Sequence, residues 1–388
     1  MTLEPAAALE LGRSCASENE TGRGEAGIFN PGVRARGSVP IVRQISSGNL
    51  SPVAVLWMAL LGLYPLRALA ADPTIQRTEL APGIYLFSTS ADGYVPNGNS
   101  VAIVNDADVV VFDTHTRPST TAEVIRQLRQ VTTKPVRYLI NSHWHPDHWS
   151  GNETYLKAFP GLEIIASEET RTLMLNLAGI WPRLFEQNLA KDEAEAARTH
   201  SENAPELERE RTFVPEMKKV NRVFPTLTYE SKLTFFRGGR EFRLMSVVGD
   251  ARGTTVLYLP KEKLLVTGDA VSYPIPYFNL AMSQHARSLR MLGELEVAIL
   301  VPGHGPAWHD KKFLLQEAAL LESVVDQVRT ACRQGAITVN EVAQRVKLDA
   351  ERAQFAQGDP ELQAKFDRYA RRMIEFAFRD VRDGKFFE

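Results

Sequence analysis

The feature that most constrains this chain is a dense group of imidazole and carboxylate side chains at the end of an apolar segment. Residues 141–152 read NSHWHPDHWSGN and hold three of the eight histidines in 388 residues. The run VRYLI at 136–140 precedes them and predicts a buried strand. Packing alone gives no reason for four such groups together, so the pattern predicts a metal site at a strand end.

The spacing of these side chains indicates two metal ions. His143 and His145 are two positions apart, so in extended backbone both rings point the same way and reach one ion. Pro146 then turns the chain, which offsets Asp147 and His148 toward a second ion. Imidazole and carboxylate without thiolate suit zinc, iron or manganese. Two ions about 3.5–4 Å apart would activate one water molecule. The alternative is a purely structural histidine cluster.

The segment HWHPDH followed by GN resembles the metallo-β-lactamase superfamily. Three more motifs continue the resemblance in order over roughly residues 80–310: VVVFDTH contains Asp113, TGDAV contains Asp269, and VPGHGP contains His304. The resemblance implies an α+β fold, an αββα sandwich with its site at one edge between the sheets. It also implies that Asp269 bridges both metals, that His304 is the last ligand, and that Asp113 orients a ligand.

One position departs from the superfamily pattern. The family normally has Gly-His-Thr-x-Gly-Ser/Thr before the strand that precedes its Gly-Asp motif, whereas this chain reads GDARGTTVLYLP. Gly249 and Gly253 align, so Asp250 stands where the third histidine of the first metal site is expected. Asp250 either binds metal through oxygen, supports the site indirectly, or marks an inactive protein. With the first two histidines it would form a two-histidine-one-carboxylate face, which keeps iron in consideration.

These motifs define a predicted site and a predicted reaction. The predicted metal ligands are His143, His145, Asp147, His148, Asp250, Asp269 and His304. The predicted cofactor is a pair of zinc ions, with iron or manganese as alternatives. The resemblance implies a metal-bound hydroxide that attacks a small-molecule lactam, lactone or other ester-type substrate, with Asp147 or Asp269 as catalytic proton shuttle. Two other hypotheses are an iron-dependent oxidoreductase and a non-catalytic binding protein with a degenerate site.

Several residues near the motifs have less specific interpretations. His115 is interpreted as an ordinary loop histidine, and Arg252 as a partner of Asp250 or of an anionic substrate. Trp144 and Trp149 flank the histidines and either pack or wall the cleft. Three histidines match no motif and are interpreted as structural or solvated: His200, His285 and His309.

The N-terminal part of the chain has the pattern of an export signal. Residues 1–70 begin polar and Gly-rich and continue into the apolar run VAVLWMALLGL and the small residues ALAAD. This predicts a disordered leader and a signal peptide at about 43–70, cleaved after Ala70. The expected location is periplasmic or secreted, with no stable membrane partner after cleavage. An uncleaved anchor is the alternative.

The remaining chain divides into a catalytic domain and a helical extension. Residues 71–310 are predicted to form the metallo-β-lactamase-like domain, in which the charged segment 181–222 predicts an exposed helical insert. Residues 311–388 predict a helical C-terminal extension. A helix at 119–131 is expected to be capped by Ser119 or Thr120.

Composition excludes some other functions. The formal net charge is −2 and the basic residues are spread out, so no nucleic acid partner is expected. The chain has only two cysteines, Cys15 and Cys332, which build neither a disulfide framework nor a cysteine zinc site. The sequence does not predict an oligomeric state.

Overall fold

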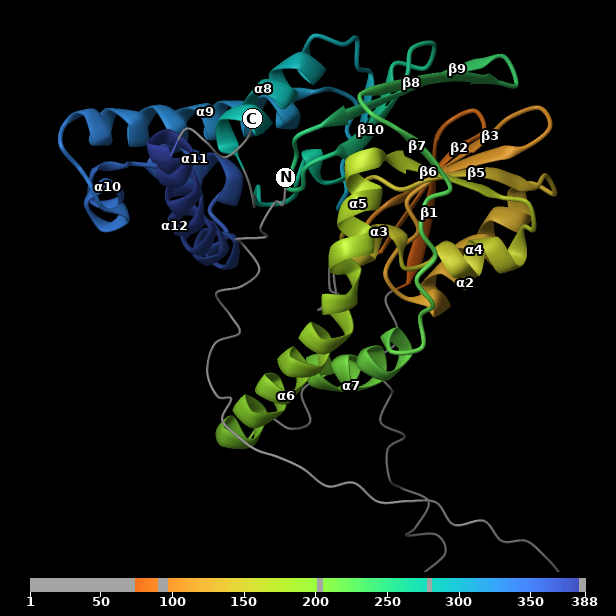
Figure 1. The fold of residues 1–388 in the computed structure, drawn as a ribbon, viewed down its shortest axis with the longest axis horizontal. Helices are drawn as coiled ribbons and strands as arrows, with labels where there is room; N and C mark the ends of the chain where they lie inside the picture. The colour runs from red at the N-terminus through yellow and green to blue at the C-terminus, as the bar shows by residue number, and fades with distance from the viewer. Residues whose placement is uncertain (1–73, 90–96, 201–204, 278–280, 384–388) are drawn as a thin grey trace, which may run out of the picture. The chain divides into compact units, whose positions relative to one another are not determined.

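The computed structural model describes residues 74–89, 97–200, 205–277 and 281–383 (Figure 1). The predicted leader and signal peptide at 1–70 lie outside these residues. No helix in the described ranges combines the length and the hydropathy needed to cross a bilayer.

The first sheet has seven strands in chain order. The first four strands run antiparallel to their neighbours, and the fourth to seventh strands run parallel to one another. The strands are β1 (Ile75–Ala81), β2 (Ile84–Thr89), β3 (Ser100–Val104), β4 (Val109–Phe112), β5 (Val136–Ile140), β6 (Glu163–Ser167) and β7 (Leu227–Tyr229). All four residues of β4 are buried, as expected of a central strand covered on both faces.

The second sheet has five strands in the order β12-β11-β10-β9-β8. Only its β11–β12 pair is parallel. The strands are β8 (Lys232–Arg237), β9 (Arg240–Val247), β10 (Thr254–Leu259), β11 (Leu264–Val266) and β12 (Ile299–Val301). One apolar cluster joins the facing sides of the two sheets, for example Ile103 and Phe112 with Phe242 and Leu257. Burial of this shared face holds the sheets together.

Helices cover the outer faces of both sheets. Helices α2 (Pro118–Val131) and α4 (Asn152–Ala158) pack on the first sheet through side chains such as Leu128 and Tyr155. Helices α8 (Met282–Gly293) and α9 (Lys312–Arg333) pack on the second sheet through side chains such as Leu289 and Leu321. The predicted αββα sandwich is therefore confirmed.

The predicted helical insert and helical extension are also present. The insert follows α5 (Glu168–Leu177) and a 3-10 turn, η1 (Ala178–Ile180), and its helices α6 (Trp181–Thr199) and α7 (Pro205–Met217) lie against each other (Figure 1). In the extension, α9 is followed by α10 (Val339–Arg345), α11 (Asp349–Ala356) and α12 (Pro360–Asp383). Thr338 and Glu341 form a reciprocal capping box that fixes the start of α10. The domain boundaries stay predictions.

The predicted cap of the 119–131 helix is wrong. Helix α2 begins one residue earlier, at Pro118, and its N-cap residue Arg117 makes no side-chain capping bond. Instead, Glu216 of α7 accepts a hydrogen bond from the backbone N–H of Ser119 at 2.8 Å and pairs with Arg117 at 2.7 Å. A carboxylate at a helix N-terminus is favourable because the first N–H groups lack partners within the helix. The insert therefore supplies the cap.

Candidate metal centre

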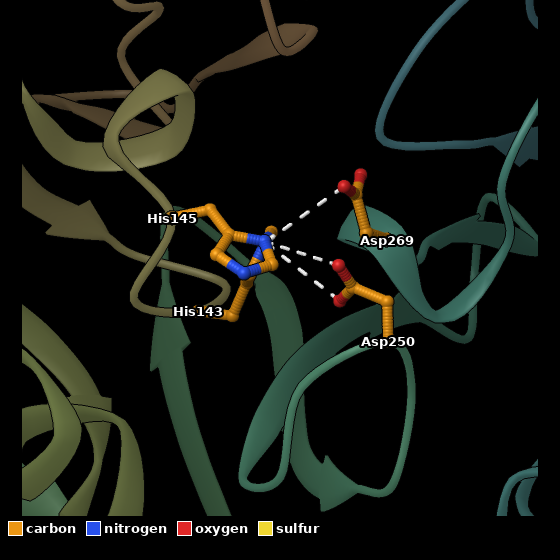
Figure 2. A group of neighbouring side chains, drawn as sticks. All are labelled: His143, His145, Asp250 and Asp269. Carbon is orange, nitrogen blue, oxygen red and sulfur yellow. Dashed lines mark hydrogen bonds and ion pairs between the residues drawn. The ribbon is translucent and has the colours of Figure 1, made fainter. Parts of the chain in front are cut away.

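The first group of candidate ligands gathers at the edge between the sheets. His143 and His145 follow β5, Asp250 lies in the β9–β10 loop, and Asp269 lies in a 3-10 turn, η2 (Gly268–Ala270), after β11. The four side chains point toward one another, and one potential ligand atom from each lies within 4.8 Å of all the others (Figure 2). Asp250 Oδ2 is 3.1 Å from His145 Nδ1, and Asp250 Oδ1 is 3.7 Å from His143 Nε2.

The second group consists of Asp147, His148 and His304. The first two lie on a single-turn helix, α3 (Pro146–Trp149), which starts where Pro146 turns the chain, and His304 follows β12. Asp147 Oδ2 is 3.2 Å from Nε2 of both histidines. The expected offset between the two halves of the HWHPDH motif is therefore present.

Asp269 lies between the two groups. Its Oδ2 is 3.8 Å from His143 Nε2 and 3.4 Å from His304 Nε2, and its Oδ1 is 3.5 Å from His148 Nε2. One carboxylate thus faces histidines of both groups, which is the arrangement needed to bridge two ions.

Close backbone approach makes this convergence possible. At Gly303 an added Cβ would lie 1.7 Å from Asp269 Oδ1, so no larger residue fits while that carboxylate keeps its place. Gly98 likewise lies against His148, where a Cβ would be 2.6 Å from the ring. The backbone N–H of Asn99 donates to Gly303 O at 2.6 Å, which fixes these two segments to each other.

Asp113 contacts the candidate ligand His148 through the ring nitrogen that faces away from the site. It accepts hydrogen bonds from Ser142 N and Ser142 Oγ, both at 2.7 Å, and from His148 Nδ1 at 2.8 Å. Because Nδ1 donates to Asp113, Nε2 of His148 faces the site. Asp113 adopts a left-handed backbone with φ of 60°, a conformation that aspartate tolerates better than most residues. This contact matches the orienting role expected from the sequence.

Charge in the cluster is divided unevenly. Burial opposes ionisation of Asp147 and Asp269, but the facing histidines outweigh it and lower the pKa of both carboxyls. Burial also opposes the charge on His304, yet Asp269 and Asp147 raise its pKa to about 10. Asp250 behaves differently: burial and the Asp269 carboxylate raise its pKa although His145 opposes the rise.

The residues fit a bound metal. Three buried ligand atoms have no hydrogen-bond partner in the described part of the chain: Asp250 Oδ1, Asp269 Oδ1 and His148 Nε2. Buried polar atoms are normally satisfied, so three orphans at one point indicate a missing partner. His143 Nε2 and His145 Nδ1 also face each other at 2.9 Å. Nitrogen and carboxylate oxygen donors suit zinc, iron or manganese.

Two buried residues support the site: His285, which the sequence left as structural or solvated, and Glu317, which matches no sequence motif. His285 of α8 donates from Nε2 to Ala270 O at 2.8 Å, and Glu317 of α9 accepts from Ser272 N at 3.2 Å. Both side chains are buried and hold the turn that carries Asp269. The signal for Glu317 was available, because it is a charged residue on the apolar stripe of a helix.

The other histidines and Arg252 can now be placed. His115 is fully buried, has a left-handed φ of 68°, and has two ring nitrogens without a hydrogen-bond partner among the described residues. It is therefore not an ordinary loop histidine. Arg252 pairs with Glu169 at 2.7 Å. His200 ends α6 in a left-handed conformation, and His309 is exposed.

Comparison with known proteins gives a family and a fold. The sequence profile of the metallo-beta-lactamase superfamily matches residues 93–304, more than half of the chain. A linear primary-alkylsulfatase of Pseudomonas sp. (strain ATCC 19151) is 22% identical over 267 residues. That match covers 62% of this chain and 48% of the relative, so the chain spans about half of that protein's length.

The chain is similar to two solved structures to different degrees. The stereoselective inverting sec-alkylsulfatase of Pseudomonas sp. has a TM-score of 0.57 at 17% identity, covering 81% of this chain and 52% of that one. A metallo-beta-lactamase from Pontibacter korlensis has a TM-score of 0.48 at 18% identity, covering 64% of this chain and 99% of that one.

Proposed function

Because the chain belongs to the metallo-β-lactamase superfamily, we propose that it is a hydrolase that binds two zinc ions and cleaves an ester-type small molecule. Sulfate esters are the leading substrate class, since the relative named above is an alkylsulfatase. Lactams and lactones, which the resemblance to the superfamily also implies, are the classes to compare with it. Export to the periplasm or beyond remains part of this proposal.

One observation carries the proposal. Asp269 faces histidines of both ligand groups, at 3.8 Å from His143 and at 3.5 and 3.4 Å from His148 and His304. Structural ion pairs rarely need one buried carboxylate to serve three imidazoles, whereas a two-metal site does. The orphaned oxygen of Asp269 supports the same interpretation.

The chain's own residues have definite tasks in this proposal. Bound metals supply Lewis acidity, which activates water and polarises a substrate oxygen. Asp113 keeps His148 in the orientation that presents Nε2 to the site. The facing histidines lower the pKa of Asp147 and Asp269, so both carboxylates are ionised near neutral pH and ready to bind a cation. In this proposal one of them also shuttles the proton of the attacking water.

The position of Asp250 supports the first of the three interpretations of this residue, that it binds metal through oxygen. Its carboxylate lies among the first ligand group, and one of its oxygens has no hydrogen-bond partner in the described residues. A carboxylate that only supported a ligand from behind would use that oxygen in a hydrogen bond. We therefore assign Asp250 as a metal ligand through oxygen within this proposal.

An iron-dependent oxidoreductase is the second candidate. His143, His145 and Asp250 come together as two histidines and one carboxylate, the ligand set of many non-haem iron sites. Bound iron with substrate-dependent oxygen consumption would favour this candidate over the hydrolase.

The deciding experiment combines metal analysis with turnover. The full chain is purified, its metals are quantified by mass spectrometry, and hydrolysis of aryl sulfate, lactone, β-lactam and phosphodiester probes is followed. We expect about two zinc ions per chain, loss of hydrolysis on chelation, and recovery on zinc addition. Two bound zinc ions with no hydrolysis of any probe would instead favour a binding protein. N-terminal sequencing of the protein from bacterial cell fractions tests cleavage after Ala70.

A further inference from the structure

A cavity lies between the metal-binding loop and the helical insert. Its volume is about 140 Å³, and its lining includes Pro146 and Trp149 of α3, Trp181 and Phe185 of α6, and Met217 of α7. Most lining side chains are apolar or aromatic. The insert therefore does more than expose a charged surface, because its inner side walls a cavity next to the metal loop.

Residues of two small apolar clusters line the cavity. Trp149, Met174 and Ala178 form one cluster, with Trp181 packed against it. Phe213, Val214 and Met217 form the other, with Phe185 packed against it. Protein interiors are normally close-packed, and side chains around a gap lose contacts that a filled core would provide. An apolar group of a ligand would restore those contacts.

Trp181 connects this cavity to the first ligand group. Its ring lies edge-on to His145 with 5.6 Å between centroids, and 5.1 Å from the ring of Trp144. A group in the cavity would thus be separated from a candidate metal ligand by a single indole ring. The sequence interpretation that the tryptophans wall a cleft applies to Trp149, which lines the cavity.

Trp181 also presents an unused hydrogen-bond donor. Its Nε1 is buried and has no acceptor within the described ranges. A buried indole N–H normally finds an acceptor, so this one is available to the oxygen of a ligand or of a water molecule that a ligand displaces. Arg222 contributes to the same lining and is compatible with a negatively charged ligand, whereas Lys218 in that lining pairs with Glu186.

We propose that this cavity is a recognition pocket for a compact apolar group, about the size of one aromatic ring, on a substrate whose ester or sulfate oxygen accepts a hydrogen bond from Trp181. An engineered apolar cavity of about 150 Å³ in another protein binds benzene, which sets the size of the group. The substrate class is accordingly aryl esters, with aryl sulfates first, rather than long linear alkyl esters. This inference rests on the proposed function.

Binding of sulfonates tests the pocket without turnover, because a sulfonate has no ester bond to cleave. Benzenesulfonate, methanesulfonate and decanesulfonate are titrated into the zinc-loaded full chain by calorimetry. Burying one aromatic ring favours benzenesulfonate over methanesulfonate by about tenfold or more. Decanesulfonate is expected to bind no better than benzenesulfonate. Equal or undetectable binding of the first two, or a clear preference for the long chain, overturns the proposal.

Variants locate the binding site. Trp181→Phe keeps an aromatic ring but removes the N–H, so it should weaken the binding of all three sulfonates. Ala178→Leu fills the cavity and should abolish the preference for benzenesulfonate over methanesulfonate. Phe236→Ala, at a side chain that is 70% exposed on β8, is the control and should change nothing. Metal content and circular dichroism show whether each variant is folded. A preference that survives Ala178→Leu in a folded protein contradicts the pocket.

Kinetics separates this inference from the proposed function. Hydrolysis of aryl and methyl esters at similar kcat/KM would leave the hydrolase proposal in place and reject the pocket. Selective benzenesulfonate binding without hydrolysis of any ester would support the pocket and reject the hydrolase proposal.

Discussion

The two candidate ligand groups share Asp269 but differ in how the protein holds them. In the second group, His148 is tied to Asp113, which is itself fixed by Ser142. In the first group, Asp250 carries a buried oxygen without a hydrogen-bond partner in the described part of the chain, and its pKa is raised by burial. Ser142 Oγ also lies 2.9 Å from His143 Nδ1, so hydrogen bonds position one histidine of each group. The two groups differ in Asp250, a carboxylate of the first group whose charge a bound cation would balance.

Asp269→Asn should have the largest effect, because it removes the carboxylate that both groups face. We expect fewer than two zinc ions per chain and a fall in kcat/KM of at least about a hundredfold, since each metal supplies several kcal/mol of charge stabilisation. Metal analysis and steady-state kinetics measure both. Asp310→Asn, at a surface aspartate, is the matched control. If the metal content of Asp269→Asn equals that of the natural protein, Asp269 does not bind both ions.

Substitutions of Asp250 should act on the first group alone. Asp250→Asn removes the charge and should weaken one of two zinc sites, while Asp250→His introduces the residue that the superfamily pattern carries there and should keep both. Stepwise zinc titration against a competing chelator resolves the two affinities. If Asp250→Asn binds both ions as tightly as the natural protein, Asp250 is not a ligand.

Asp113→Asn should act on the second group. Asparagine tolerates the left-handed backbone of this position, so the fold should survive. Loss of the carboxylate partner of His148 should cost about 10–100-fold in metal affinity or activity. The same zinc titration provides the measurement, and the first site, whose His143 is linked to Asp113 only through Ser142, serves as the comparison. If Asp113→Asn lowers the zinc affinity of the first site and not that of the second, Asp113 does not act on the second group.

Glu317→Gln should have the smallest effect, and it depends on pH. Burial raises the pKa of Glu317 well above that of the unfolded chain, so ionisation above the unfolded pKa favours unfolding. The amide oxygen of glutamine still accepts from Ser272 N. After chelation, the stability of the natural protein relative to the variant should therefore fall as pH rises from 4.5 to 8. Urea unfolding across this range measures the difference, and a constant difference would contradict the assignment.

Local pattern was sufficient for much of the fold. The apolar run VRYLI became β5 with the bounds expected from the sequence. Strand β1 was not predicted because four of its seven residues are exposed, and β7 was not predicted because it has only three residues. Short or exposed edge strands lack the apolar run that reveals a buried strand.

The sequence by itself determined the superfamily, the sandwich of sheets and helices, and the identity of the seven candidate ligands, since motif residues and hydrophobic periodicity are local properties of the chain. Motif spacing and the resemblance already predicted two ligand groups with Asp269 between them, whereas only the tertiary structure gave the distances and placed His304 with Asp147 and His148. It also decided that Glu317 holds the Asp269 turn and that Trp181 borders His145. These contacts join segments brought together by helix and sheet packing, which no local pattern encodes.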